Sequence, residues 1–170
     1  ANLSVAQTAE YRVTITNITL GQTFTPQLVV THDTSAKLFK LGDPASEPLE
    51  MLAEGGDTGP LTEAVAEVST DAVTIDGLLG PGETASTTIT GDPETDAISM
   101  AAMLIPTNDV FFALNRAGLP REGGYQRLLQ AYDAGTEDND QSCANIPGPR
   151  CGGEGFASGG GEGFVHISNG

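Results

Sequence analysis

An acidic loop at residues 132–140 carries the side chains best suited to chemistry in this chain. Its sequence is YDAGTEDND, in which four carboxylates stand beside a hydroxyl and an amide. Carboxylates at this density repel one another, so the loop needs either full solvation or a compensating cation. Oxygen-only ligands suit a hard ion such as Ca²⁺. The loop alone therefore leaves two alternatives open, a solvated acidic turn and a calcium site.

A second acidic position follows another predicted strand. The apolar run at 97–105 predicts a central strand buried on both faces, and Asp109 comes directly after it. A strand predicted at 125–132 delivers the chain into the acidic loop. If both strands leave the sheet at the same end, Asp109, Asp133 and Glu137 meet at one pole. With backbone carbonyls and water they supply the six to eight oxygens that calcium takes. Asp138 and Asp140 are expected to be exposed companions.

The elements that position these residues are mostly strands. Alternation of apolar and polar residues predicts a half-buried strand at 10–18, and a second strand follows at 24–31. Two short helices are expected at 46–55 and 60–68, with Ser46 as the first N-cap, covering one end of a sheet. Residues 72–76 and 86–90 predict a hairpin or a pair of edge strands. Turn signals about every ten residues favour an all-β, antiparallel β-sandwich with a short helical insert at about residues 46–68.

Composition excludes several classes of partner. The 170 residues carry a formal charge of −16, and the 7 Lys and Arg residues are scattered along the sequence. Binding to nucleic acid needs clustered cations, so it is excluded. No run approaches the roughly 18 apolar residues of a membrane span. The length fits one domain, residues 1–170, with a core of its own.

The two cysteines predict a disulfide. Cys143 and Cys151 flank a short stiff stretch that contains Pro147 and Pro149, and their spacing does not match a CxxC redox or zinc motif. Such a bond is expected in an oxidising compartment, and hence in a secreted protein. The glycine- and proline-rich segment 143–163 predicts a surface loop. Residues 164–168 resemble the start of a strand without a partner, so we expect the domain to continue through further C-terminal strands.

The histidines and hydroxyls offer little chemistry. His32 and His166 each end an apolar strand run, and they would form part of a transition-metal site only if their strands adjoined. No nucleophile motif such as G-x-S-x-G is present, and an acidic protein always supplies pairs of carboxylates. We therefore expect no enzyme activity.

Four segments resemble a known family: YRVTITNIT with FTPQLVVTHD, then LIPTNDVFFAL, YDAGTEDND and GEGFVHISNG. They are similar to the spondin N-terminal domain family, found in F-spondin, mindin and many bacterial secreted proteins. The resemblance implies a β-sandwich with a calcium ion at one end, whose ligands include Asp109, Asp133 and Glu137. Glu137 stands where animal members have Asp, and Val110 stands where they have Trp. Recognition through that aromatic is therefore not carried over.

Three functions remain open from the sequence. The first is a secreted, calcium-binding, non-catalytic sandwich in adhesion or surface assembly, with an unidentified protein or glycan partner. The second is a self-assembling subunit of an extracellular fibre or matrix, joined through the glycine-rich segment and the open C-terminal strand. The third is a transition-metal protein that uses His32 and His166.

Overall fold

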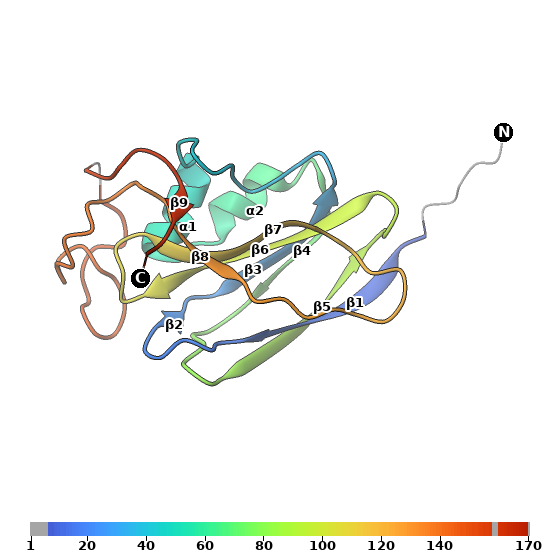
Figure 1. The fold of residues 1–170 in the computed structure, drawn as a ribbon, viewed down its shortest axis with the longest axis horizontal. Coiled ribbons are helices and arrows are strands. Elements are labelled where there is room, and N and C mark those ends of the chain that lie inside the picture. The colour runs from blue at the N-terminus through green and yellow to red at the C-terminus, as the bar shows by residue number, and fades with distance from the viewer. Residues whose placement is uncertain (1–6, 158–159, 170) are drawn as a thin grey trace.

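A seven-stranded antiparallel sheet forms the centre of the computed structural model, which describes residues 7–157 and 160–169. The strand order is β4-β3-β6-β7-β8-β9, and β2 pairs with β6 outside that order. A second sheet, of β1 and β5, covers one face, while α1 and α2 cover the other (Figure 1). The strands are β1 (Ala9–Thr16), β2 (Thr23–Phe24), β3 (Gln27–Asp33), β4 (Ser69–Ile75), β5 (Thr84–Gly91), β6 (Asp96–Ile105), β7 (Val110–Gly118), β8 (Gln130–Asp133) and β9 (His166–Ile167). The helices are α1 (Glu47–Gly55) and α2 (Gly59–Val65).

The central sheet is buried on both faces, which follows from the alternation of side chains along a strand. In β3, Val29 packs between the two sheets, whereas Leu28 and Val30 pack under the helices. All three side chains have no exposed surface. The two apolar layers so formed confirm the predicted antiparallel sandwich, and β6 is the doubly buried strand expected at 97–105.

The helical insert begins where the sequence signals predict, but α2 ends at Val65, before the predicted end at 68. Ser46 caps α1 by accepting a hydrogen bond from the amide of Leu49, and Gly56 ends the helix in the left-handed conformation. The apolar face of α1 places Leu49 and Leu52 against the sheet with no exposed surface. None of the helices in the described part of the chain is long and apolar enough to cross a membrane.

Of the two alternatives for 72–76 and 86–90, the hairpin is wrong and the pair of edge strands is confirmed. β4 pairs with β3, whereas β5 pairs with β1 in the other sheet. The link between them is held by Leu79, which exchanges two backbone hydrogen bonds with Phe24 and is buried in the core. Because this contact carries the chain across the sandwich, the two strands cannot turn back on each other.

The strand expected at 125–132 is shorter than predicted. Only its end, as β8, pairs with β7, a strand that the sequence reading did not identify although Val110–Leu114 is apolar. Residues 120–129 leave the sheet instead, and the Tyr125 hydroxyl donates to the Gly118 carbonyl at 2.9 Å. Leu128, left at the surface, is 83% exposed.

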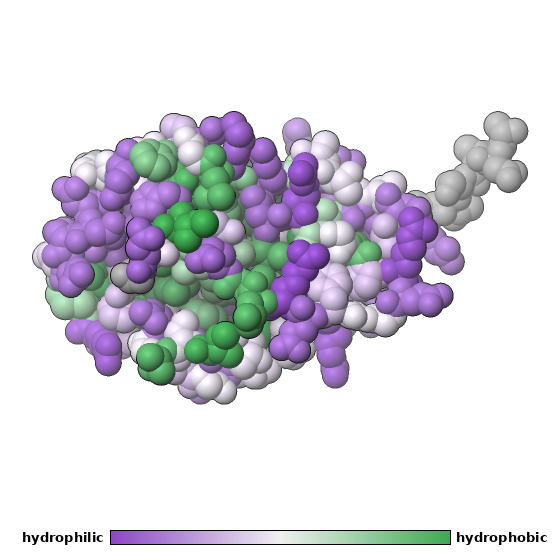
Figure 2. Space-filling view, viewed as in Figure 1, coloured by the Kyte–Doolittle hydropathy of each residue, from purple (hydrophilic) through white to green (hydrophobic). Residues whose placement is uncertain are grey.

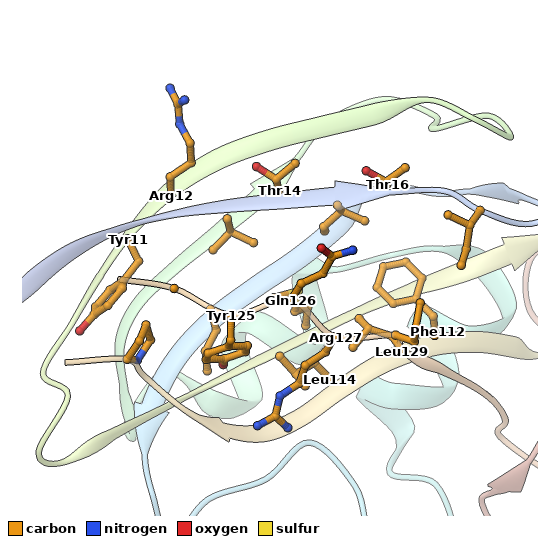
Figure 3. A pocket seen from close by; sticks show the side chains of 18 of the residues that line it. Tyr11, Arg12, Thr14, Thr16, Phe112, Leu114, Tyr125, Gln126, Arg127 and Leu129 are labelled. Carbon is orange, nitrogen blue, oxygen red and sulfur yellow. The ribbon is translucent and has the colours of Figure 1, made fainter. Parts of the chain in front are cut away.

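Because residues 120–129 leave the sheet, an apolar groove lies between the two sheets. The groove has a volume of about 770 Å³ and lies between β1 and residues 119–131. Tyr11, Phe112 and Leu129 point into it, while Arg12 and Thr14 point away from the far side of β1 (Figure 3). Figure 2 shows the corresponding band of apolar residues between the sheets, with polar residues over the loop end of the molecule. The groove is a gap in the sandwich that is lined by apolar residues and also by Gln126 and Arg127.

The strand start at 164–168 has a partner, contrary to expectation. Its residues His166 and Ile167 form β9, which pairs antiparallel with β8. The amide of Val165 also donates to the Asp43 carbonyl, and Val165 is fully buried.

Packing of α1 on the sheet gives a first prediction. Replacing Leu52 by Ala removes a buried side chain and leaves a cavity, so the free energy of unfolding should fall by about 2–5 kcal/mol. Leu128→Ala is the matched control and should stay within about 0.5 kcal/mol of the wild type. Urea denaturation monitored by circular dichroism measures both. Equal effects would contradict this packing of α1.

Candidate functional site

Two loops meet at one pole of the sandwich, as the sequence reading required. β6 and β8 are each antiparallel to β7, so they run parallel to one another and end on the same side. The loop after β6 contains Asp109, and Asp133 is the last residue of β8, directly before the other loop. Both lie at the end of the molecule opposite the start of β1, beside the C-terminal end of α1 (Figure 1). We call this end the acidic pole: Glu54, Asp109, Asp133, Glu137, Asp140 and Glu162 with His166.

The Asp109 side chain links the loop after β6 to the loop after β8 through hydrogen bonds. Its Oδ2 atom accepts hydrogen bonds from the Thr136 amide at 2.8 Å, the Thr136 hydroxyl at 3.2 Å and the Glu137 amide at 3.1 Å. Its backbone carbonyl also accepts from the Ala134 amide. The side chain has no exposed surface, and Oδ1 has no hydrogen-bond partner. One oxygen therefore shapes the loop while the other stays uncommitted.

The bend of this loop depends on Gly135. Its φ is +68°, in the left-handed region, and a Cβ atom there would collide with the backbone carbonyl of Phe164. The Gly135 carbonyl accepts a hydrogen bond from the Gly163 amide at 2.8 Å. Glycine is thus required both for the turn and for the close approach of the C-terminal segment.

Glu137 is buried beside Asp109. Its Oε2 accepts from the Asn108 amide group at 3.1 Å, whereas Oε1 is buried without a partner. Asn108 also donates to Asp140, which is a companion at the rim and not part of the buried group. Asp133 is 3% exposed; its Oδ1 accepts from the Gly135 amide at 2.8 Å and its Oδ2 from Asn139 at 2.9 Å. Asp109 and Glu137 therefore lie side by side, and the charge of Asp133 is near Asp109, whereas the ligand atoms of Asp133 lie within 4.8 Å of those of Glu162 and His166.

Glu54 joins them, although the sequence reading missed it. It lies near the end of α1, is 1% exposed, and its Oε2 accepts from the Ala157 amide at 3.0 Å. Its Oε1 is buried without a partner, close to Thr136 and Glu137. On the helix it follows the apolar Leu52 and Ala53. A carboxylate among buried apolar neighbours on a helix was the available signal.

Electrostatics at the pole disfavour the charged carboxylates. Burial is the main cause that raises the pKa of Asp109, with the nearby Asp133 charge adding to it and the Thr136 and Glu137 donors opposing it. Burial also raises the pKa of Glu54 and of Glu137, which lie against each other. No Lys or Arg among the described residues forms an ion pair with these three groups. These three buried carboxylates thus lie close together without a Lys or Arg partner in the described part of the chain, whereas Asp133 and Glu162 lie within ion-pair distance of His166.

A second group of ligand atoms lies at the outer side of the pole. Asp133, Glu162 and His166 each offer one atom, and these atoms lie within 4.8 Å of one another, so the group can hold a metal ion. His32 is not part of it, because three strands of the sheet separate β3 from β9. The pairing of His32 with His166 as a transition-metal site is therefore wrong.

His32 instead forms a buried pair with Ser99. The His32 Nδ1 donates to the Asp33 carbonyl, so Nε2 accepts from the Ser99 hydroxyl at 2.7 Å. Ser99 Oγ also accepts from the Arg116 amide at 2.8 Å. The two side chains are 1% and 0% exposed, so a substrate cannot reach them. This pair satisfies polar groups inside the sheet.

The predicted disulfide between Cys143 and Cys151 is present. It closes the loop that follows the acidic segment, and the Gly153 and Glu154 amides bond back to Ile146 and Ala144 within it. The bond therefore stabilises the loop next to the acidic pole.

The fold and the pole define a class: a β-sandwich with a buried cluster of carboxylates at one end. The family model Spondin_N matches residues 14–144, which is most of the chain, and the chain belongs to this family. The match spans both Asp109 and the loop at 133–137. No curated protein matches the chain.

The raised pKa values give a second prediction. In a chelator, folded protein binds more protons than unfolded protein at pH values just above the ordinary carboxyl range, so stability should fall as pH rises there. Asp109→Asn removes one buried charge and should make the chelated protein more stable at pH 7, with a flatter pH profile. Thermal melts in EDTA between pH 5 and 8, a range roughly one to four units above the ordinary carboxyl pKa values, measure this.

Asp76→Asn is the matched control, because it removes the same charge from an exposed position. It should leave the slope of stability against pH unchanged. Carboxyls with a lowered pKa, such as Asp71, change the stability only at lower pH, because the stabilisation they give is lost when they become protonated. A loss of stability in Asp109→Asn at pH 7 in EDTA would contradict the account.

Proposed function

We propose that this Spondin_N domain is a secreted, non-catalytic module for adhesion or surface assembly whose pole binds calcium through Asp109, Asp133 and Glu137. One observation carries the proposal. Asp109 Oδ1, Glu137 Oε1 and Glu54 Oε1 are all buried at this pole without hydrogen-bond partners. An unpaired buried charge is costly, and a divalent cation would offset that cost for several carboxylates at once.

The donor set suits calcium among the common ions. The inner part of the pole offers carboxylate and carbonyl oxygens, and calcium tolerates six to eight such ligands in flexible geometry. Glu137, one methylene longer than the aspartate of animal members, can bind in the bidentate manner that calcium accepts. Glu54, which lies against Glu137, is proposed to add a further oxygen to the shell.

Two further observations support the secreted, non-catalytic part of the proposal. The disulfide between Cys143 and Cys151 is typical of an oxidising compartment. The Ser99–His32 pair is sealed inside the sheet, and the groove of Figure 3 offers no nucleophile beside a base. The surface near the pole is instead strongly acidic and suits contact with a partner.

Calcium binding gives a third prediction. Calcium at about 100 times its Kd should stabilise the fold by about 2.7 kcal/mol, equal to a rise in Tm of roughly 5–10 °C. Glu137→Gln should remove most of this response. Glu122→Gln, at an exposed position outside the pole, should keep it. Differential scanning calorimetry with calcium or EDTA measures the shift.

A wild-type Tm that does not change with calcium would overturn the calcium part. For the adhesive part, beads coated with wild-type protein should attach to cell or matrix surfaces in calcium and detach in EDTA. Beads coated with Glu137→Gln protein should not attach. Attachment that is independent of both calcium and Glu137 would contradict a role of the pole in adhesion.

Self-assembly is a second candidate, favoured by the edge of β1. In the part of the chain that the structure describes, β1 has one strand neighbour, β5, so its other edge offers unpaired backbone groups along eight residues. The C-terminal strand does not serve this purpose as expected, because β9 already pairs with β8.

Assembly through this edge gives a fourth prediction. Arg12→Pro, at an exposed position whose backbone donor faces the open edge of β1, should abolish any oligomer, and Thr14→Lys, on the exposed face, should weaken it by charge repulsion. Size-exclusion chromatography with light scattering measures the mass. A wild-type monomer at all concentrations tested would remove this candidate.

A further inference from the structure

The outer group of the acidic pole is built by the pairing of two strands. Asp133 and His166 stand directly opposite each other in the β8–β9 ladder, so their side chains share one face. Glu162 precedes His166 by four residues and returns to it through the turn at Gly163. The positions of all three side chains therefore follow from the backbone of this corner.

The imidazole of His166 is fixed in one orientation. Its Nδ1 lies 3.1 Å from the Ile167 carbonyl, and because a carbonyl only accepts, Nδ1 carries a proton. The other nitrogen, Nε2, points between the carboxylates of Asp133 and Glu162. That atom is buried and has no hydrogen-bond partner. A metal-binding histidine is commonly held in this way, through a hydrogen bond from its second nitrogen.

Two of the three spacings among these ligand atoms are longer than direct hydrogen bonds and match a bound ion, and the third is below 4.8 Å. His166 Nε2 lies 3.5 Å from Asp133 Oδ1 and 3.6 Å from Glu162 Oε2. An N–H···O hydrogen bond spans about 2.7–3.2 Å. Ligand atoms at the corners of a zinc tetrahedron with bonds of about 2.1 Å are roughly 3.4 Å apart. The observed distances are close to this edge length.

We propose that His166, Glu162 and Asp133 bind a second metal ion of the zinc class, separate from the calcium of the inner pole. Imidazole nitrogen is a ligand for zinc and related ions, whereas calcium selects oxygen. The side chain of Asp133 is 5% exposed, and its Oδ1 accepts a hydrogen bond from the Gly135 amide. This ligand is therefore held in a fixed position. Glu162 and His166 are 44% and 27% exposed, which leaves room for a water as fourth ligand.

The two ions would share Asp133 through its two oxygens, so the test avoids this residue. Zinc binding is measured by competition with a colorimetric chelator, on metal-free full-length chain in the presence of saturating calcium. The wild type should bind one zinc ion per chain, and His166→Gln and Glu162→Gln should each weaken binding at least about tenfold. Glu154→Gln, at an exposed position in the same segment, is the matched control and should bind as the wild type does.

Cobalt substitution reports the geometry directly. The wild type should show the visible absorption bands of a four-coordinate cobalt ion with a nitrogen ligand, and His166→Gln should lose them. Unchanged zinc affinity in His166→Gln would overturn the proposal. Zinc binding that is absent from the wild type would also overturn it, and would indicate that His166 serves as an imidazolium paired with its two carboxylates.

The calcium and zinc proposals fail in different ways. Glu137→Gln should lose the calcium response and keep zinc binding, whereas His166→Gln should do the reverse. If zinc binds and calcium has no effect, the proposed function fails while the second site stands. If calcium displaces zinc in strict competition, there is one site only, and the second site is refuted.

Discussion

The acidic pole depends on one buried carboxylate, that of Asp109. Its Oδ2 accepts three hydrogen bonds from Thr136 and Glu137, and these bonds hold the loop after β8 against the loop after β6. The same burial that makes the bonds strong also makes the charge costly. Because the side chain has no exposed surface and Oδ1 has no partner, the protein must offset this charge from outside its own sequence or protonate it. The proposed cation would resolve that conflict.

The rest of the pole is arranged around this constraint. Gly135 allows the loop to turn sharply enough for the Phe164 backbone to approach it, which brings β9 onto β8. α1 delivers Glu54 from the helical layer on the other side. Four segments far apart in the sequence therefore converge, and each adds negative charge or a fixed backbone contact. The same β8–β9 pairing also positions His166 beside Asp133 and Glu162.

The sequence predicted the parts of this arrangement that local pattern determines. The alternation in β1, the cap at Ser46 and the apolar run of β6 follow from residue spacing, and the loop at 133–137 follows from its motif. Strand pairings and side-chain contacts between residues far apart in the sequence were not predictable in this way. Residues 72–76 and 86–90 look like a hairpin, yet the buried contact between Leu79 and Phe24 sends them to different sheets. Glu54 was missed because its role depends on neighbours about eighty residues away in the sequence.

The central claim is that the buried carboxylates form a calcium site, and direct titration tests it best. Isothermal titration calorimetry of calcium into the chelator-stripped chain counts the ions and locates them when it is repeated on Asp109→Asn. The account predicts one strong site per chain in the wild type and a loss of that site in the variant. Absence of binding to the wild type, or equal binding to both proteins, would contradict it.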